Sequence, residues 1–278
     1  MTDVREFFEA QAQVETDKQA DLRRAKEEIA GPVPLIPDAP DVSLNLQRGL
    51  LVRNEYKTEV IVRELTGADE EALARTKEAT DFFDMVIALG VVSVGDFDLS
   101  SLPVAERQGY LRTLLIGERD QIFLAIVKAT FGERKTMTFS CQTCQEDQEI
   151  DLLLSEDFKP QEVKEVTTDI LTYQTSKGDE LQYRLVTGED QLEAFARKNS
   201  TTPEQNTIIL SRVITKRNNG LIPDPLAFVR SMPMRDRQNI LAALVSHQPT
   251  IDLMVTTKCA ACGADQPLIL GWVDLFRP

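Results

Sequence analysis

The chain has 278 residues, of which 42% are hydrophobic, and carries a formal net charge of −14. This length and apolar content allow two modest domains or one elaborated domain with a proper core. Because nucleic-acid affinity depends on Lys and Arg neutralising phosphates, the acidic balance argues against a nucleic-acid partner. The sequence shows neither a secretory signal nor an apolar run long enough to span a membrane, so we expect a soluble protein made in a cytoplasm.

The N-terminal stretch is predicted to form an arm. Residues 3–30 are good helix formers with a thin apolar stripe that includes Phe7, Phe8 and Leu22. A helix with so narrow a stripe is marginal by itself in water, and the four prolines that follow favour an extended tether. We predict that residues 1–44 form a helix on this tether and that the stripe contacts another subunit. A frayed tail, or a helix folded back onto its own domain, is the alternative.

The first half of the body, residues 45–155, begins with an alternating strand pattern at residues 60–65. Thr66 follows it in a Thr-x-x-Asp start, which is typical of a helix N-terminus because the hydroxyl can cap free N–H groups and acid is favoured there. We expect one amphipathic helix with apolar positions from residue 73 to residue 89. Another helix, over residues 121–131, leads towards the first pair of cysteines.

All four cysteines lie in two Cys-x-x-Cys pairs, Cys141 with Cys144 and Cys259 with Cys262. Alternating polar and apolar residues flank each pair, which predicts a β-hairpin with the cysteines at its tip. Two such turns supply the four thiolates that tetrahedral zinc binds at about 2.3 Å. Although the pairs are far apart in the sequence, we predict that they share one structural zinc ion.

Other roles for the cysteines fit less well. Thiols stay reduced in a cytoplasm, so two structural disulfides are the weaker reading. A redox role would place Cys-x-x-Cys at the start of a helix, whereas both pairs lie inside strand patterns. Four cysteine ligands leave no open position on zinc, and the single histidine, His247, has no remaining cysteine to act with. We therefore predict a non-enzymatic protein, with a thiol oxidoreductase or another enzyme as the alternative.

The second half, residues 156–278, shows the same order of predicted elements as the first. A strand pattern again runs into a Thr-x-x-Asp start, at Thr187 as at Thr66. Ile122 and Ile240 lie at the same distance before the first cysteine of their respective pairs. We predict an α+β fold of two pseudo-repeated units, each of strand, helices and cysteine hairpin, that together hold one zinc. Coincidence between unrelated parts of an α+β chain is the alternative.

Two smaller expectations concern the second half. Residues 155–180 are polar and acidic, which indicates a connector with a strand at residues 170–173 and a turn at residues 177–179. The single tryptophan, Trp272, directly follows the second hairpin. We expect it to anchor that hairpin by packing against it.

Several features between residues 45 and 155 occur together in a characteristic order. They are the strand and turn at residues 60–67, the segment at residues 117–124, the aromatic-glycine stop at residues 131–132, and the first cysteine pair. This combination resembles the baseplate proteins of contractile-tailed, T4-like bacteriophages, a group that includes hub and hub-assembly components.

The resemblance implies a non-enzymatic structural part that works through contacts with other baseplate or tail proteins. It implies a place in the tail baseplate of the virion, in several copies per particle, after synthesis in the host cytoplasm. An assembly chaperone that binds tail components but is absent from the finished particle is the alternative.

Overall fold

The computed structural model describes residues 41–161, 163, 170–196, 199–248 and 250–276. The predicted contact residues Phe7, Phe8 and Leu22 lie outside the described residues, as does almost all of the predicted arm. Among the helices that the structure describes, none combines the length and the apolar character needed to cross a bilayer.

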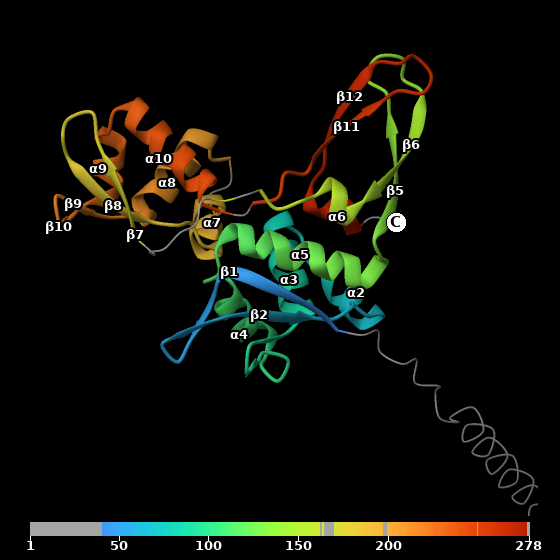
Figure 1. The fold of residues 1–278 in the computed structure, drawn as a ribbon, viewed down its shortest axis with the longest axis horizontal. Coiled ribbons are helices and arrows are strands. Elements are labelled where there is room, and N and C mark those ends of the chain that lie inside the picture. The colour runs from blue at the N-terminus through green and yellow to red at the C-terminus, as the bar shows by residue number, and fades with distance from the viewer. Residues whose placement is uncertain (1–40, 162, 164–169, 197–198, 249, 277–278) are drawn as a thin grey trace, which may run out of the picture. The chain divides into compact units, whose positions relative to one another are not determined.

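The described chain is an α+β fold, as predicted, built from small antiparallel sheets and helices (Figure 1). The first part of the chain consists of β1 (Val42–Val52), β2 (Glu55–Val62), α2 (Gly67–Leu73), α3 (Ala79–Gly90), β3 (Val91–Val94), β4 (Phe97–Asp98), α4 (Val104–Leu111), α5 (Ile116–Phe131), β5 (Arg134–Ser140) and β6 (Asp147–Leu153). A short helix, α6 (Leu154–Asp157), follows.

The second part of the chain repeats this order of elements. It consists of β7 (Ile170–Gln174), β8 (Glu180–Arg184), α7 (Gly188–Phe195), α8 (Thr202–Val213), β9 (Ile214–Arg217), β10 (Gly220–Leu221), α9 (Pro225–Ser231), α10 (Met234–Ser246), β11 (Met254–Lys258) and β12 (Asp265–Ile269). The 3-10 helix η1 (Trp272–Phe276) ends the described chain. In both parts, pairs of strands alternate with pairs of helices.

The two four-stranded sheets also share their connectivity and an irregularity. Their strand orders are β1-β2-β3-β4 and β7-β8-β9-β10, with antiparallel neighbours throughout. The pairing of β2 with β3 shifts register between Ile61 and Val62, and that of β8 with β9 shifts between Gln182 and Tyr183. Val62 and Tyr183 occupy corresponding positions in front of the two threonine starts.

Both predicted helix starts are confirmed, and a buried aspartate organises each of them. Asp69 accepts hydrogen bonds from the backbone N–H and the hydroxyl of Thr66, at 2.8 and 2.9 Å, and is held by Arg63. Asp190 makes the same contacts with Thr187 and Arg184, and Arg212 adds a further hydrogen bond at 2.7 Å. The two helices therefore begin with the same local network.

One expectation about the first part is wrong. The apolar positions from residue 73 to residue 89 belong to two helices, α2 and α3, and not to one. The N–H groups of Arg75 and Thr76 turn back to the carbonyls of Ala72 and Leu73, and the Thr76 hydroxyl also donates to Leu73 at 2.7 Å. Because these contacts satisfy the last carbonyls of α2, the helix ends there.

A buried acid at the start of a core helix ties down the first hairpin of each part. Glu118 accepts from the backbone N–H groups of Arg48 and Gly49 at 2.6 and 2.7 Å, and from Leu115 at 3.0 Å. Asp236 accepts from the N–H and hydroxyl of Ser176 at 3.0 and 2.8 Å, and from a tyrosine hydroxyl at 3.0 Å. Burial is the main influence on Glu118 and raises the pKa of its carboxyl.

The hydrophobic residues form two clusters. One is built from β1 to β3 and the helices α3 and α5, and the other from β8, α8 and α10. Trp272 packs against the first cluster, in which apolar residues around its own hairpin also take part. Its ring lies 5.0 Å from Phe123 and 5.6 Å from Phe83 between centroids, so η1 covers α3 and α5 of the first part.

Candidate metal centre

Both cysteine pairs lie at the tips of β-hairpins, as predicted. β5 pairs with β6 up to Ser140 opposite Asp147, and β11 pairs with β12 up to Lys258 opposite Asp265. The strands of each hairpin are paired regularly up to the residue before the first cysteine, and a tight turn follows. Figure 1 shows the two hairpins next to each other.

The two turns have the same backbone geometry. Cys141 donates its N–H to the Glu146 carbonyl at 2.9 Å and accepts from Gln145 at 2.9 Å. Cys259 donates to Ala264 and accepts from Gly263 at 2.9 and 2.8 Å. Gln145 and Gly263, which follow the second cysteine of each pair, have φ angles of 64° and 71°. Glycine adopts this left-handed conformation at no steric cost, whereas Gln145 does so with some strain.

The four cysteine sulfurs come together in one cluster. All lie within 4.8 Å of one another, and the pairs that cross between hairpins are Cys141 with Cys262 at 3.8 Å and Cys144 with Cys259 at 3.6 Å. A tetrahedral metal with sulfur bonds of about 2.3 Å requires sulfurs about 3.8 Å apart. None of the four is in a disulfide. The cluster therefore has the dimensions of a four-thiolate metal site.

The pKa values of the thiols differ within the cluster. The Cys262 N–H, which donates to the Cys259 sulfur at 3.3 Å, is the main cause that lowers the pKa of Cys259 to about 6. At Cys144 the Glu146 N–H favours the thiolate, but burial and the neighbouring sulfurs outweigh it and raise the pKa to about 12. Four adjacent thiolates would repel one another, and a metal cation held among them would offset that charge.

Two glutamines that the sequence did not single out brace the cluster. The Gln148 carbonyl oxygen accepts from the N–H of Ala260 at 2.8 Å, and its amide nitrogen donates to the Cys259 sulfur. The Gln266 oxygen accepts from the N–H of Gln142 at 3.0 Å. Each glutamine thus reaches from its own hairpin to the turn of the other. The repeated Asp-Gln dipeptide, at the same spacing after each pair, was the signal that could have identified them.

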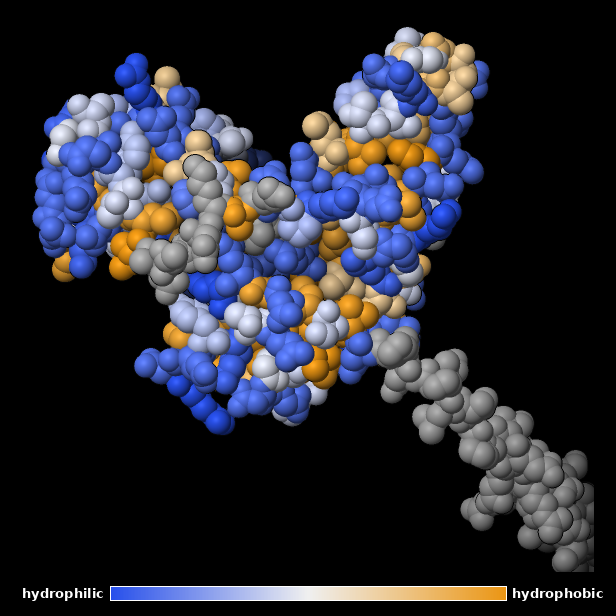
Figure 2. Space-filling view, viewed as in Figure 1, coloured by the Kyte–Doolittle hydropathy of each residue, from blue (hydrophilic) through white to orange (hydrophobic). Residues whose placement is uncertain are grey.

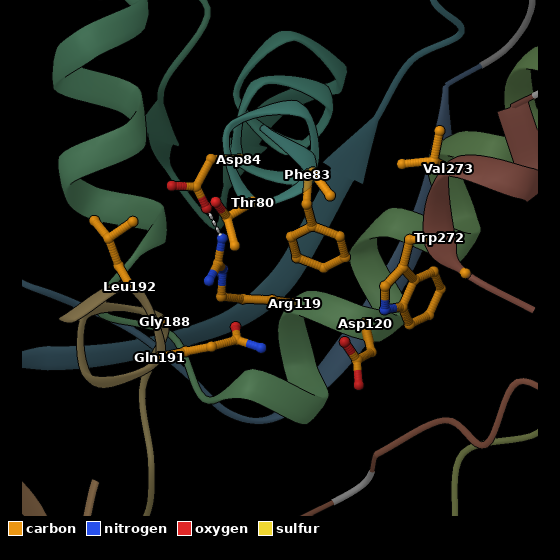
Figure 3. A pocket seen from close by; sticks show the side chains of 12 residues that line it. Thr80, Phe83, Asp84, Arg119, Asp120, Gly188, Gln191, Leu192, Trp272 and Val273 are labelled. Carbon is orange, nitrogen blue, oxygen red and sulfur yellow. Dashed lines mark hydrogen bonds and ion pairs between the residues drawn. The ribbon is translucent and has the colours of Figure 1, made fainter. Parts of the chain in front are cut away.

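A separate pocket lies beside α3 and α5, with a volume of about 220 Å³ (Figure 3). Its charged groups are engaged with one another, because Asp84 pairs with Arg119 and accepts from Arg112 at 2.6 Å. Burial raises the pKa of the neighbouring Asp120 to about 7. His247 contacts none of these groups in the hydrogen bonds that the described residues make. Its ring nitrogen Nδ1 lies 2.7 Å from the Ala243 carbonyl at the end of α10.

The fold and the cluster define an α+β protein with a four-cysteine centre at the tips of paired hairpins. The sequence profile of the family described as T4 bacteriophage base plate protein matches residues 54–277, a span that runs from β2 to η1 and includes both hairpins. The chain belongs to this family, which confirms the resemblance inferred from its sequence. No curated protein matches the chain significantly. Nor does any solved structure.

Proposed function

We propose that the chain is a non-enzymatic structural subunit of the phage tail baseplate, stapled by one zinc ion and acting through contacts with other baseplate or tail proteins. The observation that carries the baseplate role is the family match over residues 54–277. Because a part of the virion tail works through its contacts, a rigid body with defined surfaces suits this role. An assembly chaperone that leaves before the particle is complete is the competing function.

The proposed zinc ligands are Cys141, Cys144, Cys259 and Cys262. The sulfur separations suit a tetrahedral site, and the soft thiolate donors favour zinc over magnesium or calcium. Each hairpin is a separate two-stranded sheet, and among the described residues no ladder pairs one sheet with the other. A shared ion would join them and contribute directly to folding stability.

We further propose that the two parts of the body are a degenerate internal repeat. The order of elements supports it, as do like residues that recur at the separation of the cysteine pairs, namely Arg112 and Arg230, Arg119 and Arg237, Ile122 and Ile240, and Gln148 and Gln266. Their contacts also correspond, since Arg119 pairs with α3 and Arg237 hydrogen-bonds Thr207 of α8. The test is a superposition of residues 57–154 on 180–270 in an experimental structure.

The N-terminal segment completes the proposal. Phe7, Phe8 and Leu22 would bind a neighbouring chain in the assembled particle, because their stripe is too narrow to form a core of its own. The binding free energy of this contact would then offset the entropy cost of ordering the helix.

The baseplate role is tested by quantitative mass spectrometry of purified particles of the phage that encodes the chain. A structural subunit is expected at a fixed ratio to the other baseplate proteins. Abundance in infected cells together with absence from particles would identify the assembly chaperone instead. Metal analysis of the purified protein is expected to find one zinc per chain.

A further inference from the structure

The two parts of the chain meet through a short stretch of backbone. Ile116 donates its N–H to the Val186 carbonyl at 3.2 Å, and Gly188 donates to the Leu114 carbonyl at 3.1 Å. Leu115 and Thr187 form the antiparallel bridge between these two bonds. The segment in front of α5 is thereby added to the strand that leads into α7.

Side chains complete this junction. Leu115 is buried in the second cluster, and Ile116 packs against it. The Arg119 guanidinium passes so close to Gly188 that a Cβ there would lie 2.1 Å from it. A side chain at residue 188 would therefore force the Arg119 guanidinium of the other part of the chain to move.

The corresponding stretch of the first part, residues 65–68, is open. Val186 and Gly188 are buried, whereas Leu65 is only half-buried and Gly67 is exposed. A Cβ at Gly67 would meet nothing within 4 Å. In the described part of the chain, no group donates to the Leu65 carbonyl, and the N–H of Gly67 has no acceptor.

An apolar groove adjoins this open stretch. It has a volume of about 520 Å³ and is lined mainly by Leu65, Leu73, Phe82, Phe131 and Phe276. Figure 2 shows hydrophobic residues reaching the surface in the region where Figure 1 places α2 and α5. The internal junction in the second part uses backbone hydrogen bonds and apolar packing. The free backbone groups of residues 65–67 and the groove offer the same two kinds of contact in the first part.

The complementary segment lies at the start of α10, where Met232 is buried and Met234 is exposed. Met232 and Met234 lie after α9 as Leu114 and Ile116 lie after α4, with a matching turn in which Met232 donates to Val229 as Leu114 does to Leu111. Whereas Ile116 is packed in the junction, the side chain of Met234 is 74% exposed. Pro233 stands in the place of Leu115, whose N–H takes no part in the junction because it bonds Glu118.

We propose that residues 232–234 of one copy of the chain dock onto residues 65–67 and the adjoining groove of a second copy, so that the internal junction is repeated between chains. The Met234 N–H would donate to the Leu65 carbonyl, and the Gly67 N–H to the Met232 carbonyl. The Met234 thioether would enter the groove against its phenylalanine rings, a favourable sulfur–aromatic contact. This inference rests on the proposed internal repeat.

Charged residues of opposite sign lie beside the two surfaces. Arg230 and Arg235 are exposed on either side of the docking segment, and Glu70 and Glu71 are exposed beside the groove. The two arginines beside the docking segment would attract the two glutamates beside the groove. Because the two surfaces differ, each copy retains one of each kind, and association proceeds head to tail into a ring or a filament.

The test uses the full chain and two variants, Gly67→Ala and Met234→Asp, followed by sedimentation velocity up to about 100 µM. The wild type is expected to associate with rising concentration. Each variant is expected to weaken association roughly tenfold or more, because the new methyl meets Arg237 of the docked copy and the aspartate cannot enter an apolar groove. Gly109→Ala and Leu221→Asp are matched controls, since the Gly109 Cβ position is open and the Leu221 side chain is 83% exposed.

A mixture of the two variants makes the test specific. Gly67→Ala retains the docking segment and Met234→Asp retains the groove, so the mixture is expected to form a one-to-one dimer that does not extend. A monomeric wild type, variants that associate like the wild type, or a mixture that fails to pair would each overturn the proposal. Particles that contain the protein while the purified chain stays monomeric would leave the baseplate role intact and assign the groove to another protein.

Discussion

Gln148 and Gln266 hold each other's cysteine turns, for each extends from the second strand of its own hairpin and accepts the N–H that follows the first cysteine of the other, Ala260 at 2.8 Å and Gln142 at 3.0 Å. Gln266 is buried. The relationship is reciprocal, so four hydrogen-bonding groups align the two tips with each other.

Replacing either glutamine by leucine should therefore weaken metal binding. Loss of residues that orient metal ligands typically costs about 10-fold to 100-fold in affinity, and we expect a change of that size for Gln148→Leu and for Gln266→Leu. Competition of the purified protein with a chromogenic zinc chelator measures it. Gln238→Leu, on the exposed side of α10, is the matched control and should bind zinc like the wild type. Equal affinity in all of these proteins would show that the brace has no influence on the site.

Removing a ligand should affect folding itself. Because apparent zinc-binding energies of small zinc domains are on the order of 10 to 16 kcal/mol, Cys141→Ser or Cys259→Ser should lower the melting temperature far more than a surface change does. A chelator should bring the wild type close to the variants. Thermal unfolding with parallel metal analysis checks this, and a variant that loses its metal yet melts like the parent would contradict a folding role.

Acidification should expose the contribution of Asp190. Burial alone would raise its pKa, but the hydrogen bonds from Arg184 and Thr187 outweigh burial and lower the pKa to about 2. A depressed carboxyl pKa stabilises the fold fully above its unfolded value near 4, and the stabilisation is lost as the pH falls towards 2. We expect Asp190→Asn to cost about 2 kcal/mol at neutral pH, with the difference from wild type vanishing near pH 2. Urea unfolding at several pH values measures this window.

Replacing Glu118 tests how much its buried hydrogen bonds between α5 and β1 contribute to stability. Glutamine has the same shape but only one accepting oxygen, so in Glu118→Gln one of the three backbone N–H groups would face another donor. An unsatisfied buried donor costs about 1 to 3 kcal/mol. Glu193→Gln, exposed on α7, is the control and should be nearly neutral. Chemical denaturation distinguishes the two, and equal stability would mean that water replaces the lost partner.

Deletion of residues 1–40 separates the proposed arm from the body. We expect the zinc content and melting temperature to change little, since the four prolines at residues 32, 34, 37 and 40 favour an extended tether. Incorporation into particles, measured by mass spectrometry, should fall. An unfolded truncated protein would place the segment in the intramolecular core, and normal incorporation would show that it is dispensable.

Much of the fold follows from local features of the sequence. The threonine starts at Thr66 and Thr187 are visible because capping depends on neighbours within one turn. The cysteine hairpins are visible because strand alternation and the Cys-x-x-Cys spacing are both short-range. The break between α2 and α3 was missed, since the hydroxyl of Thr76 ends α2 through a contact that apolar periodicity does not reveal.

What the sequence by itself determined was the local chemistry: two pairs of thiols on two hairpins, and two helices that begin alike. Only the tertiary structure decided that the sulfurs of Cys141 and Cys262 lie 3.8 Å apart, that Trp272 covers Phe123, and that Gly188 is closed while Gly67 is open. The physical reason is the separation along the chain of the residues that interact. Turns and caps are set by bonds between near neighbours, whereas these contacts join residues far apart in the chain and depend on how whole elements pack.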